Sequence, residues 1–253
     1  MMKLLFCLLL LPVFTMAEAE QTLPAPTMPP VVVRPLPKPD DILFLSPTIY
    51  YKPVLSADPA QCAGTPMVEL KDIEDKVLTV LCPKDHANCL MQGACYVADE
   101  WGRLRSFNYV RRGVDQLPRW GEVNTSKCPY GYGVRNVCLD PHYSVAADLD
   151  FHKLGDVIFV PRLVGVAMPD GSTHHGYLVI RDKGAAIKGP HRFDFFTGFV
   201  EPYVSANIMR KLGFSESKNS FVYRKATAEE AEMVRRYTAY PGLIPVPTPR
   251  PEL

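Results

Sequence analysis

The chain has almost no net charge, because 28 lysines and arginines stand against 27 aspartates and glutamates in 253 residues, which leaves +1 at pH 7. Without a basic excess to neutralise phosphates, no nucleic-acid partner is expected. No stretch is long and apolar enough to cross a bilayer, so no transmembrane segment is predicted. The cysteines lack the Cys-x-x-Cys spacing of zinc sites, and no metal or other cofactor is expected.

The N-terminal residues have the pattern of an export signal. A lysine at position 3 precedes an apolar run from Leu4 to Val13, and the small-x-small sequence Ala17-Glu18-Ala19 follows. This order is typical of a secretory signal peptide, so residues 1–19 are predicted to be removed near Ala19. The product is expected to be secreted or periplasmic, and monomeric.

Six cysteines remain after the predicted cleavage, and an even number in an exported chain favours disulfide bonds. Two pairs are close enough in sequence to be local links, and they leave one further pair. The predicted pairs are Cys89–Cys95, Cys128–Cys138 and Cys62–Cys82.

Composition divides the rest of the chain, because the 25 prolines cluster at its two ends. From residue 104 onwards, short strand-like runs alternate with turn residues, a pattern typical of a β-barrel or a β-sandwich. A capping box at Thr227 and Glu230 predicts a C-terminal helix. The predicted segments are a proline-rich arm (20–60), a small β-rich extension linked by disulfides (61–103), a mainly β catalytic domain (104–225), and a helix with a proline-rich tail (226–253).

Three aspartates each follow an apolar strand-like run: Asp148, Asp182 and Asp194. Carboxylates at strand ends can converge at the mouth of a barrel. Converging carboxylates repel, so the pKa of one rises and that group stays protonated near neutral pH. A protonated carboxyl beside a glycosidic oxygen is a general acid. An aspartate is also a common turn residue, so each of the three has a structural alternative.

These motifs resemble the three-aspartate barrel domain of the membrane-bound lytic transglycosylase A family and related muralytic proteins. Asp148 is followed by Leu154-Gly155. The pattern Asp-x-Gly-x-Ala-Ile-Lys-Gly covers residues 182–189, and Asp194 lies in an aromatic strand. The resemblance covers less than half of the chain.

The resemblance implies a six-stranded double-psi β-barrel. It also implies cleavage of the β-1,4 bond between N-acetylmuramic acid and N-acetylglucosamine in peptidoglycan glycan strands. Asp194 matches the residue that acts as acid and then as base, and Asp182 would be its partner. Asp148, Lys188 and His191 are the expected substrate-binding neighbours.

Two alternatives stay open. A lysozyme-like hydrolase on the same barrel would need a second carboxylate to activate water or stabilise the sugar cation. A module that only binds peptidoglycan would use aromatic rings, which cover the apolar face of a sugar. The candidate carboxylates are Glu100, Glu122, Asp148 and Asp150, and the further candidates for sugar contact are Glu122, Trp120 and Tyr132.

Overall fold

The structure is a computed structural model that describes residues 42–99 and 101–243, all within the compact unit that extends from Val31 to Leu253. The predicted signal peptide, the arm up to residue 41, Glu100 and the last ten residues of the tail lie outside the described residues. Within the described ranges, no helix is long and apolar enough to cross a membrane.

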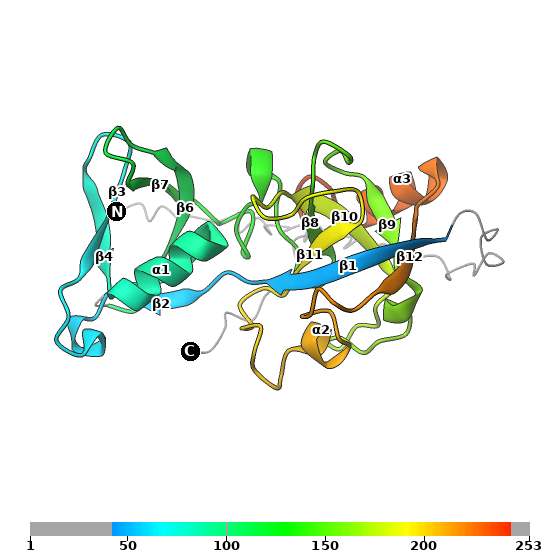
Figure 1. Cartoon of the computed structure of the whole chain (residues 1–253), viewed down its shortest axis with the longest axis horizontal. Coiled ribbons are helices and arrows are strands. Elements are labelled where there is room, and N and C mark those ends of the chain that lie inside the picture. Colours follow the sequence, from blue (N-terminus) through cyan, green and yellow to red (C-terminus); the bar gives the residue numbers. More distant parts are fainter. Residues whose placement is uncertain (1–41, 100, 244–253) are drawn as a thin grey trace, which may run out of the picture. The chain divides into compact units, whose positions relative to one another are not determined.

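Strands from both ends of the described chain close into a six-stranded barrel in the order β1-β11-β8-β10-β9-β12 (Figure 1). β1 pairs in parallel with β11, and β8 in parallel with β10, whereas the other neighbours are antiparallel. The prediction of a mainly β, six-stranded double-psi barrel is confirmed. The bounds are β1 Leu43–Tyr50, β8 Ser144–Ala147, β9 Val157–Phe159, β10 Tyr177–Asp182, β11 Arg192–Phe196 and β12 Phe221–Lys225.

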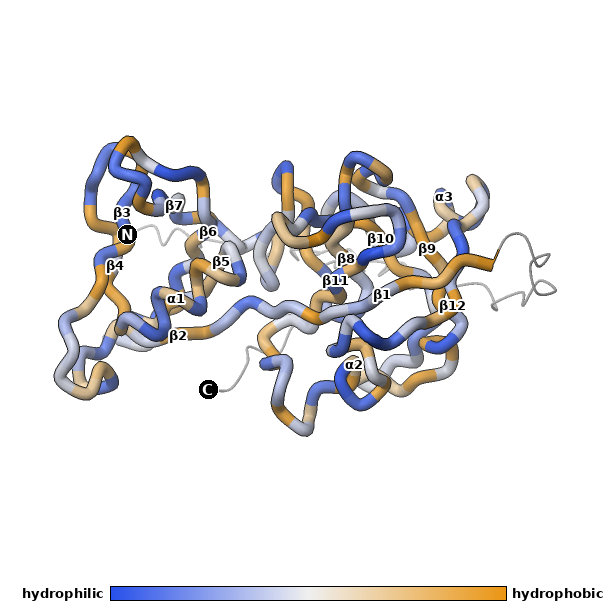
Figure 2. The backbone as a smooth tube through the Cα atoms, viewed as in Figure 1, coloured by the Kyte–Doolittle hydropathy of each residue, from blue (hydrophilic) through white to orange (hydrophobic). Residues whose placement is uncertain are grey.

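Alternation along the strands fills the barrel with apolar side chains. Val145 and Ala147 of β8 and Phe193 and Phe195 of β11 are fully buried in one core cluster. The residues between them face the other side of the wall, because side chains alternate along a strand. Figure 2 shows orange, hydrophobic stretches in β1 and β9.

The barrel begins earlier in the chain than the sequence predicted. The predicted proline-rich arm (20–60) includes residues 43–50, yet these residues form β1, a strand of the barrel wall whose Leu45 and Ile49 side chains lie in the core. The segment 104–123, assigned to the barrel, instead contributes two strands to another sheet. Local sequence could not decide this, because strand membership depends on partners far away in the chain.

The segment between β1 and β8 forms a second six-stranded sheet, in the order β2-β5-β6-β7-β3-β4, where the sequence indicated only a small extension. Helix α1 (Pro83–Gln92) and the sheet enclose a core that includes Phe107 and Trp120. The strands are β2 Val54–Ser56, β3 Val68–Lys71, β4 Val77–Leu81, β5 Ala94–Ala98, β6 Leu104–Arg112 and β7 Pro118–Val123.

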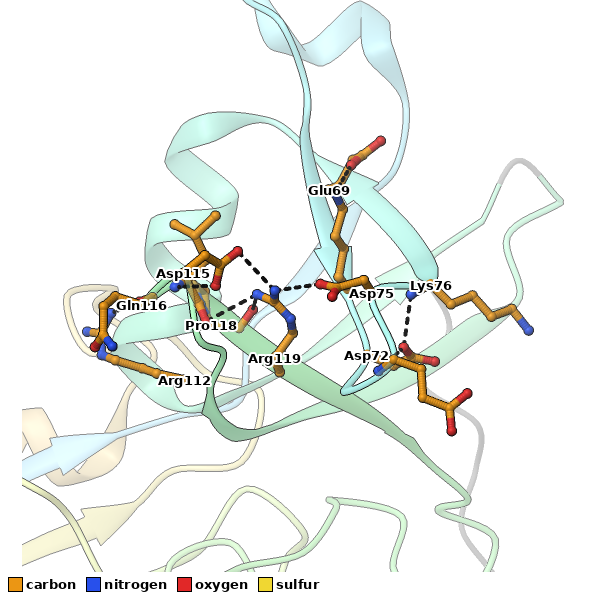
Figure 3. Close-up of polar contacts among 12 residues, drawn as sticks. Glu69, Asp72, Asp75, Lys76, Arg112, Asp115, Gln116, Pro118 and Arg119 are labelled. Carbon is orange, nitrogen blue, oxygen red and sulfur yellow. Dashed lines mark hydrogen bonds and ion pairs between the residues drawn. The ribbon is translucent and has the colours of Figure 1, made fainter.

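Two turns of this sheet are joined by the buried guanidinium of Arg119 (Figure 3). It forms ion pairs with Asp75 of the β3–β4 turn and with Asp115 of the β6–β7 turn, at 2.5 and 2.9 Å. A Cβ on Gly113 would lie 2.7 Å from the Arg119 Cζ, so a larger residue there would require the Arg119 guanidinium to shift.

The three predicted disulfides are confirmed: Cys62–Cys82, Cys89–Cys95 and Cys128–Cys138. The first two lie in the region of the second sheet, and the third closes the loop that precedes β8.

The C-terminal helix is confirmed as α3 (Ala228–Tyr237), with the capping box at Thr227 and Glu230. Its Ala231 and Val234 pack on the outer face of the barrel against Val157 and Val179. A further short helix, α2, spans Ile208–Lys211, and the Asn207 side chain starts it by accepting from the Arg210 N–H.

Candidate active site

Asp182 and Asp194 lie on the two strands that flank β8. β10 carries Asp182 and β11 carries Asp194, and β8 lies between these two strands. In the two ladders, both aspartates pair with the same residue, Ala146. Residues level with one another on neighbouring strands point to the same face, so the two carboxylates share one patch of the barrel wall.

A β-bulge at Arg181 turns Asp182 towards this patch. Ile180 points into the barrel core, so regular alternation would send Asp182, two residues later, inwards as well. The β10–β8 register instead shifts between Ile180 and Asp182, and the extra residue re-aims the side chain. The fully buried Arg181 guanidinium secures the bulge by donating to three backbone carbonyls, those of Cys138, Thr238 and Gly242.

The two carboxylates lie on the outer face of the wall and not at the mouth of the barrel, which corrects the expectation from the sequence. Asp194 stands between Phe193 and Phe195, which both fill the interior. The Asp194 side chain must therefore point outwards.

Three donors hold the Asp182 carboxylate. The Val134 and Lys183 N–H groups donate to Oδ1 at 3.0 and 2.8 Å, and the Tyr50 hydroxyl donates to Oδ2 at 3.2 Å. Burial raises the pKa of Asp182 to about 6; the three hydrogen bonds oppose the rise, and the Asp194 charge adds to it. The donors favour the ionised form at this position.

Asp194 has fewer partners. Burial raises the pKa of Asp194 to about 6, against the lowering effects of the Thr48 hydroxyl and of Arg192. Its Oδ1 is buried, and no described residue forms a hydrogen bond with it. A buried carboxyl oxygen without a donor favours the neutral, protonated group.

With both pKa values raised to about 6, the pair can hold one proton near pH 6, and the donors favour Asp182 as the ionised member. Two neighbouring carboxyls in unlike surroundings divide into a charged member and an acid. Such an acid can protonate an oxygen placed beside it, and the resulting carboxylate can then accept a proton from another hydroxyl.

Comparison with known families agrees with this geometry. Residues 143–211 match the family model of the 3D domain. Asp148, Asp182 and Asp194 all lie within the matched residues, and the resemblance inferred from the sequence is confirmed.

No curated protein matches the chain. Among solved structures, it is similar to a membrane-bound lytic murein transglycosylase from Agrobacterium tumefaciens, with 17% identity and a TM-score of 0.48 over 77% of this chain and 75% of that one. It is also similar to MltA from E. coli with bound chitohexaose, with 16% identity and a TM-score of 0.46 over 73% and 72% of the two chains. MltA from Neisseria gonorrhoeae shows 12% identity and a TM-score of 0.46 over the same shares.

The third aspartate of the 3D domain has a different environment. Asp148 is buried and accepts the N–H groups of Asp150 and Gly189 at 3.2 and 2.9 Å. These hydrogen bonds lower its pKa, so the carboxylate stays charged. Asp148 thus ties the turn after β8 to the loop before β11, and no contact with the Asp182–Asp194 pair is found in the described structure.

The cationic candidates of the 3D domain are both exposed: Lys188, and His191 at the start of β11. The His191 Nδ1 lies 2.7 Å from the Tyr223 hydroxyl, which also donates to the Pro190 carbonyl. Neither candidate contacts Asp182 or Asp194 in the described structure.

The candidates before the 3D domain are not beside the pair. Trp120 is 1% exposed in the core of the second sheet, so its ring cannot cover a sugar, which corrects the prediction. Glu122 of β7 forms an ion pair with Arg105 at 2.6 Å. Tyr132 lies in the loop that approaches Asp182, and its hydroxyl donates to the Asn124 carbonyl at 3.1 Å.

Sequence reasoning missed Tyr50, Thr48 and the Val134 N–H, which surround the carboxylates. Tyr50 and Thr48 face outwards because they alternate with the core residue Ile49 of β1. The alternation of residues in this segment indicates a strand, but the prolines around it favoured a proline-rich arm. Among the described residues, no three His, Cys, Asp or Glu side chains are grouped so that they could hold a metal ion.

Proposed function

We propose that this protein cleaves the β-1,4 bond between N-acetylmuramic acid and N-acetylglucosamine in peptidoglycan glycan strands, as a lytic transglycosylase. The observation that carries the proposal is the pair of partly buried carboxyls in the 3D domain, where Asp194 keeps one buried oxygen free of protein donors. Asp182 beside it has three donors and is suited to carry the charge.

The reaction needs no water. Asp194 gives its proton to the glycosidic oxygen, which leaves with the N-acetylglucosamine as the C1–O bond breaks. The Asp194 carboxylate then takes the proton of the 6-hydroxyl of the N-acetylmuramic acid, and O6 bonds to C1. The product is a 1,6-anhydro sugar, and Asp194 is again protonated.

Asp182 has two effects in this scheme. Just as the Asp194 charge raises the pKa of Asp182, the negative charge of an ionised Asp182 would oppose the ionisation of Asp194, because like charges in one site are unfavourable. The same charge stabilises the sugar cation that develops at C1. Tyr50 and Val134 orient the carboxylate for both tasks.

Of the second-carboxylate candidates named from the sequence, three are described and Glu100 lies outside the described residues. A hydrolase would require a second carboxylate that activates water, yet Glu122 is paired with Arg105 and Asp148 accepts two backbone N–H groups. Asp150 is exposed beyond the end of β8. None of these three has a contact with Asp194 in the described structure.

The remaining expectations belong to the same proposal. Lys188, His191 and Tyr132 would contact the glycan around the pair, and peptidoglycan would be the partner of a monomeric, secreted or periplasmic enzyme. The disulfides agree with an oxidising compartment outside the cytoplasm.

Digestion of purified sacculi tests the proposal. Asp194→Asn should reduce product release by at least about 100-fold, because a general acid contributes on this scale. Mass analysis of wild-type products should find anhydro-muramic ends.

The matched control is Asp170→Asn, an exposed aspartate of the same domain whose turn-forming hydrogen bond to the Ser172 N–H an asparagine can keep. This variant should digest sacculi at the wild-type rate. Reducing muramic ends would assign a hydrolase, and full activity of Asp194→Asn would remove Asp194 from the chemistry.

A further inference from the structure

A buried lysine lies just after β1, two residues beyond Tyr50. Lys52 is 2% exposed. Its ammonium donates to the Ser106 hydroxyl at 2.9 Å and to the Asn108 side-chain oxygen at 3.2 Å, both on β6. The Tyr96 ring lies 4.8 Å from the Lys52 Nζ. Two neutral acceptors and one aromatic face therefore hold a full positive charge.

No carboxylate of the described residues forms an ion pair with Lys52. A buried ammonium without a counter-charge is costly, and a lysine side chain is seldom fully buried for packing alone. Burial lowers the pKa of Lys52 to about 8, and the charge of Asp182 acts in the opposite direction. Lys52 remains cationic at neutral pH, and Asp182 is the acidic group whose charge acts on it.

The loop 131–134 connects the two groups through its backbone. A Cβ on Gly131 would lie 2.2 Å from the Lys52 Nζ, so the loop packs directly against the ammonium. The Asn108 amide, which also accepts from Lys52, donates to the Tyr132 carbonyl at 3.4 Å. At the other end of the loop, the Val134 N–H donates to Asp182.

The groups that face Lys52 from the elements around it are few. Asp182 acts on it from β10, Tyr96 lies beneath it on β5, and Tyr132 belongs to the adjoining loop. Burial raises the pKa of Tyr96, so this phenol is neutral. Asp182 is the anionic group of this set.

We propose that Lys52 is a positioning residue for the Asp182–Asp194 pair: its buried charge keeps Asp182 ionised, and its contacts hold the loop that donates to Asp182. The inference rests on the proposed function for its catalytic meaning, and on the packing of the loop 131–134 against Lys52 and Asp182 for the link between the two groups. Because Lys52 is buried, it acts through Asp182 and not on the glycan.

The test is the variant Lys52→Met, which keeps the length of the side chain and removes the charge. Without the nearby cation, the pKa of Asp182 should rise, and the acid limb of the kcat profile should move up by roughly one pH unit. At pH 6, kcat should fall about 5-fold, whereas KM should stay unchanged because Lys52 does not touch the glycan.

The matched control is Lys84→Met, an exposed lysine in the first turn of α1, which should keep both the rate and the pH profile. A lowered kcat in Lys52→Met with the acid limb unmoved would assign Lys52 a purely structural role and overturn the inference.

A second measurement needs neither activity nor the Lys52→Met protein. Coupling between two groups is reciprocal, so Asp182→Asn should lower the pKa of Lys52 measured by NMR titration of its side chain. Equal Lys52 pKa values in wild type and Asp182→Asn would overturn the inference, even in an enzyme that digests sacculi. A lowered value would support the link even in a protein that digests nothing.

Discussion

At the scale of single residues, Asp182 and Asp194 show how two side chains of the same type can differ in their tendency to ionise. Both carboxyls are partly buried, and burial raises both pKa values to about 6. Asp182 has three donors to stabilise its charge, and the Asp194 Oδ1 has none among the described residues. The donors therefore favour the charged form of Asp182, whereas the buried Asp194 Oδ1 has no donor to favour its charged form.

The raised pKa of Asp194 predicts a stabilising substitution. An unfolded aspartate has a pKa near 3.9, so folding raises the value, and the folded protein binds the proton more tightly. The associated stability is present below about pH 4 and is lost as pH rises through 6. Asp194→Asn removes this loss, and should raise the free energy of unfolding by about 1–2 kcal/mol at pH 7.5.

Urea denaturation at pH 7.5 and at pH 4 measures this effect. The gain should shrink at pH 4, where the wild-type carboxyl is protonated in the native state. The exposed control Asp170→Asn should show little difference at either pH. A gain of equal size at both pH values would point to packing and not to the charge of Asp194.

At the scale of elements, a bulge and a loop complete the site that the strands begin. β10 and β11 bring the two aspartates level with Ala146, and the bulge at Arg181 directs Asp182 outwards. The loop 131–134 then places the Val134 N–H on the carboxylate. The position of this loop against β10 should therefore control activity.

Gly133→Ala tests this dependence. A Cβ there would lie 2.3 Å from the Arg181 carbonyl oxygen and 3.1 Å from the Asp182 Cβ, and a backbone atom cannot move aside easily. The loop must shift, so the Val134 donor should be lost and sacculus digestion should fall about 10-fold, the scale of one charge-assisted hydrogen bond.

The control is Gly64→Ala in the second-sheet region, where φ is +79° and nothing lies within 4 Å of the added carbon. It introduces backbone strain of its own but is remote from the loop. Thermal melts should show both variants folded. Equal activity of the two variants would contradict a role for the loop position.

At the scale of the whole molecule, the barrel and the second sheet have separate cores, and the disulfides are divided between them. Cys62–Cys82 links the 3-10 helix after β2 to the residue that precedes α1, across a separation of 20 residues. A link over this length stabilises a fold by about 3 kcal/mol in the loop-entropy description.

The double variant Cys62→Ser, Cys82→Ser should therefore lower the stability of the second sheet by about that amount. Trp120 in the core of this sheet reports its unfolding by fluorescence. Non-reduced peptide mapping of the wild type should recover the three pairs with no free thiol among these six cysteines. Unchanged Trp120 unfolding in the double variant would show that the link adds nothing to this core.

Much of the local structure could be predicted from the sequence. The short strand-like runs expected after residue 104 form strands such as β8, and the capping box at Thr227 begins α3. Asp182 and Asp194 were also identified from the sequence alone, because the residues around them keep the spacing of the three-aspartate pattern. These features depend on residues close together in sequence, where alternation, turn chemistry and capping act directly.

Only the tertiary structure decided which strands share a sheet and which side chains meet. It placed β1 in the barrel, removed Trp120 from the surface, and brought Lys52 and Tyr50 to the carboxylates. A bulge reverses the direction of Asp182 without any mark in the local sequence. The amino-acid sequence by itself determined the strands and the acidic groups, because their signals are local. The protonation of those groups depended on burial and on donors from distant segments, which exist only after the chain has folded.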